Sequence, residues 1–378
     1  MNKIPFSAPD IETTDLELVS EVIQSGWMAE GKYATEFESL FCKYTGAGFS
    51  TTVSSCTAGL HLSCLATGIG VGDEVIVPAQ THTATAHAVE YCGAKAIFCD
   101  ISISTGNLNI DDAKLKLSQN TKAMIIVHMA GMPCEMDEVL KFCQENDLEL
   151  IEDCAHALGT RYDGAHVGRF GSSGCFSFYP TKQITTGEGG LVISDNQDLI
   201  ERVRRMKAFG IDVPPHARTT PGVYDVGDLG YNYRMTDFQA ALGVRQLERY
   251  PLNLKKRRKN ARTYIEILKD VDGVCCPTYS EGHSFFIFQI LLDLQLDRDR
   301  ILIEMKERGI GASIHYATPV PMMSYYKNKY QISPTDFPHA VDYGRQNISL
   351  PVHQGLSEAD IRYICDTLVG LIGVANRD

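Results

Sequence analysis

The chain has 378 residues, of which 44% are hydrophobic and 22% charged, a composition typical of a globular protein long enough for two domains. Its 35 basic and 47 acidic residues leave a net charge of −12, which disfavours nucleic acid or an anionic membrane as the main partner. No apolar run approaches the length of a membrane span, about 18 residues, and the first residues contain no apolar signal core. We therefore expect a cytoplasmic protein whose 12 cysteines are free thiols.

Between residues 48 and 195, short apolar segments alternate with helix-like ones, a pattern that predicts an α/β fold with one large sheet. Seven strands are predicted, over 48–55, 74–80, 95–101, 122–129, 148–155, 173–179 and 189–195. The first five are separated by stretches long enough for crossover helices, so we expect them to be mostly parallel and buried on both faces. The last two are close enough in sequence to form an antiparallel pair.

From about residue 235 the pattern changes to a long helical stretch, for which a bend is expected at Pro251. We predict a large domain over 1–245 and a small α/β domain over 246–378, with the amino-terminal segment a candidate to pack on the small domain. The elements predicted for the small domain are a strand in 284–293, a helix over 297–309, the segment 310–316 and a closing helix over 357–372 with a Ser-x-x-Asp cap.

Three patterns that suggest other binding sites have simpler explanations. The glycines in "GIGVGDEV" (68–75) follow a helix and lead into a strand, the reverse of a dinucleotide-binding loop. The basic run 255–259 lies in a helix-like stretch, where a solvated face is the more common role. The third is a set of potential metal ligands without the close spacing of structural zinc sites, namely Cys154, His156, His166 and Cys175. We expect no metal site and no nucleic-acid partner.

Chemistry-bearing residues follow several of the predicted strands, and ligands of such sheets bind beyond the carboxyl ends of the strands. Asp153 ends an apolar strand, where a carboxylate needs a cationic partner, and a protonated ring nitrogen would serve. His156 follows closely enough to touch the same ligand, and His82 supplies another flat ring at this edge. Thr57 opens a helix in "SSCTAG" (54–59), which is either an anion site or a simple cap.

Lys182 lies in a turn rich in Thr, Gly and Glu between the last two strands, and Ser177 precedes it by five residues. A solvated loop lysine is the ordinary explanation, and a lysine that reacts with a carbonyl compound is the other. An anion site, a buried carboxylate, flat rings and this lysine together describe a pocket for pyridoxal phosphate.

The sequence resembles the DegT/DnrJ/EryC1/StrS family of sugar aminotransferases from about residue 24 to 362. The resemblance implies a fold type I pyridoxal-phosphate enzyme, with a seven-stranded mostly parallel sheet and a small carboxy-terminal α/β domain, that acts as a homodimer with shared active sites. The matching motifs, in the family's order, are "SGWMAEG", "SSCTAGLHL", "GIGVGDEVIVPAQT", "CGAKAIFCDI", "VHMAGMPCEMD", "IEDCAHALGT", "GCFSFYPTKQITTGEGG", "LGYNYRMTDFQAALG", "GIGASIHY" and "LPVHQGLSEADI".

By this resemblance, Lys182 matches the lysine that holds the cofactor covalently, and Asp153 the aspartate that pairs with its pyridine nitrogen. His156 occupies the Gln or His position near the ring hydroxyl of the cofactor. His82 falls where many members have an aromatic residue stacked on the pyridine.

The resemblance also implies the contacts to the cofactor's phosphate. Cys56, through its backbone, together with Thr57 and Ser177, matches the phosphate ligands of one subunit. Asn232, in "GYNYRMTD", matches an asparagine that reaches the phosphate from the partner subunit.

The activity implied is transfer of an amino group from L-glutamate to a keto-sugar carried on a nucleotide, in the biosynthesis of amino sugars for O-antigen lipopolysaccharide, surface glycans or antibiotics. A sugar dehydratase of the same family would have histidine in place of Lys182, so we reject it. An aminotransferase that acts on a free cyclic ketone and a catalytically silent regulatory homologue remain alternatives. The candidate substrate contacts, for which surface or packing roles are the alternative, are Trp27, Met28, Glu30, His315 and Tyr316.

Overall fold

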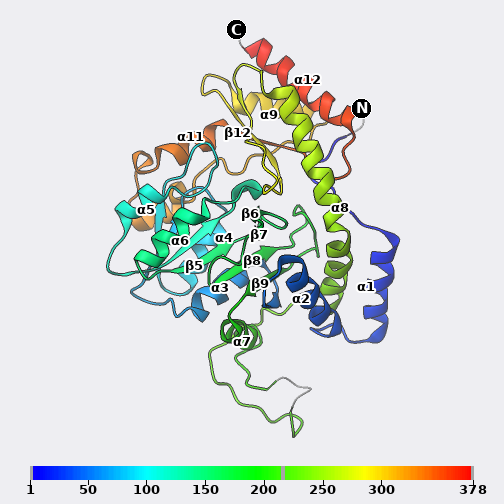
Figure 1. The fold of residues 1–378 in the computed structure, drawn as a ribbon, viewed down its shortest axis with the longest axis vertical. Helices are drawn as coiled ribbons and strands as arrows, with labels where there is room; N and C mark the ends of the chain where they lie inside the picture. The colour runs from blue at the N-terminus through cyan, green and yellow to red at the C-terminus, as the bar shows by residue number, and fades with distance from the viewer. Residues whose placement is uncertain (1–2, 214–217, 376–378) are drawn as a thin grey trace.

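The computed structural model describes residues 3–213 and 218–375. A central sheet lies between layers of helices, and a smaller domain stands beyond one end of it (Figure 1). Helix α8 (Asp237–Leu268) runs along one side of the molecule from the helices beside the sheet to the small domain. All 12 cysteines are free thiols, as expected from the sequence. Among the described residues, no helix combines the length and apolar character that crossing a bilayer requires.

The large sheet contains all seven predicted strands. Strand β9 runs antiparallel to both of its neighbours, and the other pairings are parallel, so the predicted antiparallel pair and the mostly parallel sheet are confirmed. The strands, in their order across the sheet, are β1 (Phe49–Val53), β9 (Gly190–Ser194), β8 (Ser173–Ser177), β5 (Glu149–Asp153), β4 (Thr121–Val127), β2 (Glu74–Pro78) and β3 (Lys95–Cys99).

Helices cover both faces of the sheet because its strands are apolar on both sides. In β2, for example, Val75 and Val77 face one cluster of buried side chains, whereas Ile76 faces another. The helices that contribute to the first cluster are α3 (Cys56–Ala66), α4 (Thr83–Tyr91) and α7 (Gln197–Met206), joined by α10 (Ser324–Tyr330) and α11 (Pro338–Gln346) from the carboxy-terminal part of the chain. Those that contribute to the second are α5 (Ile110–Lys116) and α6 (Met136–Glu145). Between β5 and β8 in the sequence, β6 (Arg161–Tyr162) and β7 (Ala165–His166) form a short hairpin.

Helix α8 contributes to two hydrophobic cores and contains Pro251. Its first half packs with α2 (Lys32–Thr45) against the large sheet, through Val244 and Leu247 for example, and its second half enters the small domain. Helix α1 (Thr13–Ser25) lies along α8, where Arg249 donates to the buried Asp15 carboxylate over 2.6 Å.

The small domain is built on a three-stranded antiparallel sheet of β10 (Val274–Cys275), β11 (Phe288–Leu292) and β12 (Asn347–Leu350). Near the amino terminus, Ile4 pairs with Ile310 of this domain. Asp360 and Ser357 form the predicted cap before the last helix. The remaining helices are α9 (Arg298–Glu307), α10 (Ser324–Tyr330), α11 (Pro338–Gln346), α12 (Glu358–Ala375) and the short 3-10 turns η1 (Met129–Gly131), η3 (Val320–Met322) and η4 (Pro334–Asp336).

Candidate active site

Lys182 lies in the turn between β8 and β9, at the sheet edge where Asp153 ends β5. Its amine is 4.5 Å from the centre of the Phe286 ring, which comes from the small domain. Burial of the amine lowers the pKa of Lys182 to about 8, although the nearby Asp153 and Cys56 act in the opposite direction. About a tenth of this amine is therefore unprotonated and nucleophilic at pH 7, far more than for an ordinary lysine.

Asp153 is buried, and its carboxylate is held by two hydrogen bonds from neighbouring groups. Thr85 Oγ1 in α4 donates to Oδ2 over 2.8 Å, and the Ala155 backbone N–H donates to Oδ1 over 3.0 Å. Within residues 3–213 and 218–375 no side-chain nitrogen lies within salt-bridge distance of this carboxylate, although the charge of Lys182 is close enough to interact with it. A buried carboxylate without a salt bridge among these residues fits a cationic ligand.

His156 is buried beside Lys182, with its ring stacked on Phe286 at a centroid distance of 4.5 Å. Its Nε2 lies 3.3 Å from the Tyr316 hydroxyl, whereas its Nδ1 has no hydrogen-bond partner in the part of the chain that the structure describes. Burial, followed by the positive field of Lys182, holds the pKa of His156 well below its usual range. The ring is therefore neutral.

His82 is exposed at the start of α4, where its Nδ1 accepts a hydrogen bond from the Ala84 N–H over 3.2 Å. Its ring meets the Tyr316 ring edge to face at 5.9 Å. Burial of part of the ring and the charge of Lys182 lower the pKa of His82. The structure thus brings His82 to the edge predicted from the sequence, with Nε2 left as the donor of the neutral ring.

Backbone pairing brings the predicted phosphate ligands together. Gly190 pairs with Val53 on one side and with Ser177 on the other, directly before the start of α3. A Cβ on Gly190 would lie 2.4 Å from the Ser55 carbonyl carbon and 2.5 Å from the Cys56 nitrogen, so only glycine lets these segments approach so closely. Helix α3 begins at Cys56 with its amide groups directed at this edge, which suits an anion.

Within this arrangement Ser55, rather than Thr57, caps α3, because its hydroxyl accepts from the Ala58 N–H over 3.1 Å. Thr57 is partly exposed and lines a cavity of about 450 Å³ with Tyr231 and Tyr233. The Cys56 thiol is buried and points towards Asp153 Oδ1, 3.8 Å away.

Asn232 lies in the segment that passes beside this cavity. Tyr231 and Tyr233 turn inward and stack on each other at 5.1 Å, whereas the intervening Asn232 is exposed. The Asn232 side chain accepts a hydrogen bond from Arg234 Nε over 3.2 Å and contacts none of the other predicted site residues among those described.

The candidate substrate contacts fall into two groups. His315 and Tyr316 lie at the site, and His315 packs on Phe6 at 5.4 Å. The other three precede α2, far along the chain from the lysine turn: Trp27 and Met28 are exposed, and the Glu30 carboxylate pairs with the buried Lys207 amine.

His128, Glu152 and Cys154 form a group of potential metal ligands. Two of them, Glu152 and Cys154, flank Asp153 in the sequence. The polar atoms of His128 and Glu152 already have partners in the chain. The Glu152 carboxylate accepts from the N–H groups of Gly168, Phe170 and Gly171 over 2.6 to 2.8 Å. The Cys134 N–H donates to His128 Nδ1, so His128 Nε2 carries the proton and donates to Glu152. This cluster fixes the loop that precedes β8.

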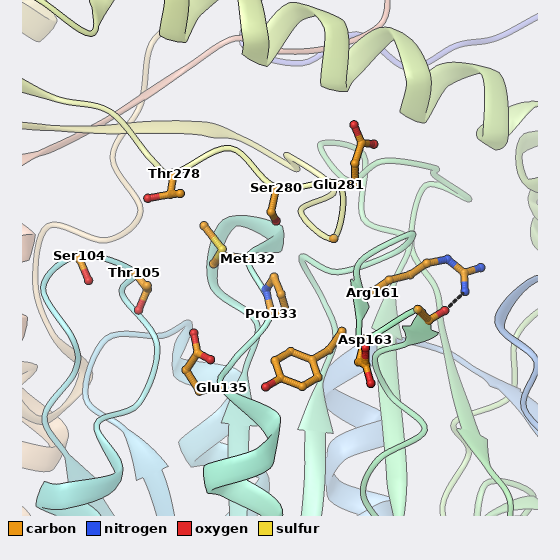
Figure 2. A pocket seen from close by; sticks show the side chains of 13 residues that line it. Ser104, Thr105, Met132, Pro133, Glu135, Arg161, Asp163, Thr278, Ser280 and Glu281 are labelled. Carbon is orange, nitrogen blue, oxygen red and sulfur yellow. Dashed lines mark hydrogen bonds between the residues drawn. The ribbon is translucent and has the colours of Figure 1, made fainter.

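A cavity of about 580 Å³ lies away from the lysine turn (Figure 2). Its walls are the loops after β3 and β4, the β6–β7 hairpin and the segment 278–282 of the small domain. Carboxylates of Glu135, Asp163 and Glu281 and several hydroxyls surround it, and none of the predicted site residues lines it.

Two residues that contact the predicted site were not found from the sequence. Thr85 holds Asp153, and its only signal is its place three residues after His82. Phe286 contacts Lys182 and His156 because the two domains pack together, and no local pattern marks it.

Comparisons with known proteins agree with this geometry. Residues 9–369 match the model of the DegT/DnrJ/EryC1/StrS aminotransferase family. The chain is 35% identical over 370 residues to GDP-perosamine synthase of Escherichia coli O157:H7, covering 97% of this chain and 98% of that protein.

Two solved structures have the same fold along the whole chain. The putative sugar aminotransferase Spr1654 from Streptococcus pneumoniae, in its PMP form, superimposes with a TM-score of 0.93 at 28% identity, covering 100% of this chain and 99% of that one. Helicobacter pylori PseC, an aminotransferase of pseudoaminic acid biosynthesis, gives 0.92 at 27% identity, covering 99% and 100%. The chain therefore belongs to the DegT/DnrJ/EryC1/StrS aminotransferase family and is a sugar aminotransferase that uses pyridoxal phosphate.

Proposed function

We propose that this enzyme transfers the amino group of L-glutamate to the keto group of a nucleotide-linked deoxysugar, with Lys182 as the residue that holds the cofactor and moves the proton. The observation that carries the proposal is the placement of an amine of lowered pKa near a buried carboxylate that has no salt bridge among the described residues. GDP-perosamine synthase and PseC, which are similar over nearly their full lengths, support a sugar substrate of this kind.

The residues at the sheet edge fit pyridoxal phosphate. Asp153 would pair with the protonated ring nitrogen, and the unpaired Nδ1 of His156 would face the ring oxygen. The start of α3, with Cys56 N–H, Thr57 and Ser177, would hold the phosphate, because a helix amino terminus and hydroxyl groups favour an anion. His82 would lie against the ring.

When bound, pyridoxal phosphate supplies an electron sink for the substrate carbon whose hydrogen is removed. The chain's own residues do the rest. Asp153 would keep the ring nitrogen protonated, because its buried carboxylate favours a neighbouring positive charge. Lys182 would take the proton from the substrate carbon and pass it to the cofactor, since an amine of lowered pKa can both accept and release a proton near neutral pH.

We also propose a homodimer in which Asn232 completes the phosphate site of the partner subunit. The support is its direction: it is exposed and turned away from the cavity that its neighbours Tyr231 and Tyr233 line. Such an exchange makes each site depend on two chains.

The substrate is tested with a panel of nucleotide-linked 4-keto-6-deoxy and 3-keto sugars, each incubated with enzyme and L-glutamate. Mass spectrometry should show one product in which an amino group replaces a keto oxygen, and Lys182→Ala should give none. Reduction with borohydride should fix the cofactor to Lys182, as peptide mapping would show. Amination of a free cyclic ketone but of no nucleotide-linked sugar would contradict the proposed substrate class.

A further inference from the structure

The two ring nitrogens of His156 have different environments. Nε2 faces the Tyr316 hydroxyl at 3.3 Å, whereas Nδ1 is buried and has no partner among the residues that the structure describes. A buried polar atom left unpaired is costly, so such atoms in native proteins usually face a ligand or water. The His156 ring is stacked on Phe286 and lies near Lys182, so a ligand bound at the lysine is the partner that we consider for Nδ1.

A neutral imidazole donates from one nitrogen and accepts at the other, so the partner of Nε2 decides what Nδ1 can do. Burial holds the pKa of His156 well below its usual range, and burial also raises the pKa of Tyr316. The phenol therefore keeps its proton and can donate it to Nε2. With Nε2 as the acceptor, the ring proton lies on Nδ1, which then becomes a hydrogen-bond donor.

Hydrogen bonds hold the backbone of Tyr316 and of the residue before it. The Tyr316 carbonyl accepts from Gln80 Nε2 over 2.7 Å and from Asn347 Nδ2 over 3.4 Å. The preceding carbonyl, of His315, accepts from Gln289 Nε2 over 2.6 Å. Gln80, Asn347 and Gln289 are all buried, so this small-domain segment reaches the large-domain histidine in a fixed orientation.

We propose that Tyr316 is a positioning residue that keeps the proton of His156 on Nδ1, so that this nitrogen donates a hydrogen bond to the ring oxygen of the bound cofactor. The inference rests on the proposed cofactor site. In this proposal Tyr316 controls the hydrogen bond that His156 makes to the cofactor, whereas the sequence suggested that Tyr316 contacts the substrate.

The proposal predicts a spectroscopic change. A hydrogen bond donated to the ring oxygen withdraws negative charge, which lowers the proton affinity of the nitrogen that joins Lys182 to the cofactor. Tyr316→Phe should therefore raise the pH midpoint of the visible absorption band of the bound cofactor by about 0.5 to 1 unit, the effect of one hydrogen bond. The matched control is Tyr264→Phe, which removes a buried hydroxyl that donates to the Pro351 carbonyl in the small domain and should leave the midpoint unchanged.

A second background isolates the role of the imidazole proton. In His156→Gln the side-chain amide nitrogen always carries hydrogens, so it can donate a hydrogen bond whether or not the Tyr316 hydroxyl is present. Adding Tyr316→Phe to this variant should therefore produce no further shift of the midpoint. An equal shift in both backgrounds, or no shift in either, would overturn the proposal. Melting temperatures establish that each variant is folded. If Tyr316→Phe does not fold, Gln80→Ala takes its place, because it removes a hydrogen bond to the Tyr316 carbonyl. Gln80→Ala should shift the midpoint in the same direction, and an unshifted midpoint in this variant would overturn the proposal as well.

The two hypotheses fail in different ways. If pyridoxal phosphate does not attach to Lys182 of the unmodified enzyme, the proposed function is wrong. If it attaches and titrates normally while Tyr316→Phe leaves the midpoint in place, only the role of Tyr316 is wrong.

Discussion

The Lys182 amine lies over the ring of Phe286, 4.5 Å from its centre, and the same ring stacks on that of His156 at a centroid distance of 4.5 Å. One small-domain side chain therefore contacts two of the residues that we assign to the cofactor site. Because an aromatic ring shields the amine from water, it contributes to the burial that lowers the pKa of Lys182.

The first prediction concerns the pH dependence of cofactor attachment. The pKa of Lys182 is lowered from its ordinary value of 10.5 to about 8, and only the unprotonated amine attacks a carbonyl. The rate at which added pyridoxal phosphate attaches to apoenzyme should therefore rise with pH and level off above about 8. Stopped-flow absorbance measures this rate, and a profile still rising steeply at pH 9.5, about 1.5 units above the expected bend, would contradict the lowered pKa.

A second prediction separates the chemical from the structural role of Asp153. Asp153→Asn nearly preserves shape but removes the charge, so the half-reaction with glutamate should slow at least about a hundredfold, while cofactor affinity changes much less. The control is Asp100→Asn. Asp100 directly follows β3, and its buried carboxylate accepts hydrogen bonds from the N–H groups of His339 and Ala340. That variant should lower the melting temperature and keep the half-reaction rate, and equal rate losses in the two variants would argue against our assignment.

The close approach of Gly190 to the start of α3 predicts a loss of phosphate binding. Gly190→Ala places a Cβ 2.4 Å from the Ser55 carbonyl carbon, so the first turn of α3 has to move. The dissociation constant of pyridoxal phosphate should rise about tenfold or more, a cost of about 1.4 kcal/mol. Gly70→Ala, at a position with no atom within 4 Å, is the control and should bind the cofactor normally. Equilibrium dialysis of both variants makes the comparison.

Loss of the Glu152 carboxylate should lower the stability of the fold strongly. Glu152→Ala removes the acceptor of three backbone N–H groups and of His128, and leaves these buried donors unpaired. The free energy of unfolding should fall by about 3 kcal/mol or more. Glu149→Ala, at the exposed start of the same strand, should change it by less than about 1 kcal/mol. Urea denaturation measures both, and similar losses would show that the buried network contributes little.

The proposed role of Asn232 in the partner's site predicts that two inactive variants complement each other in a mixed dimer. Lys182→Ala and Asn232→Ala should each have little activity alone. If Asn232 serves the partner subunit, refolding the two together gives hybrid dimers with one intact site, and about a quarter of the sites are restored. If Asn232 serves its own subunit, no hybrid contains an intact site and activity stays at the level of the separate variants.

The positions of the strands could be predicted because each depends on a local run of apolar residues. The segment predicted at 148–155 contains β5, and that at 189–195 contains β9. Their order across the sheet could not be predicted in this way. For example, β1 pairs with β9 rather than with β2, a contact between segments more than 130 residues apart that no local pattern encodes.

The same limit applies to the site. Lys182, Asp153 and His156 could be placed at one edge because strand ends meet there. The ion pair of Glu30 shows what local reasoning lacks: its carboxylate pairs with Lys207 at the end of α7, a partner that no pattern near residue 30 indicates, and its predicted substrate contact stays a prediction. Which carboxylate meets which amine depends on packing between distant segments.

Helix α8 has a thermodynamic consequence. Tyr250 on its first half is buried in the core of the large domain, and Tyr264 on its second half is buried in the core of the small one. If either core melted alone, half of the helix would lose the packing that stabilises it, and the other half would begin to fray. The two cores should therefore melt together, so that calorimetry of the unliganded chain shows one cooperative transition, with the helix as the element that joins two domains into a single folding unit.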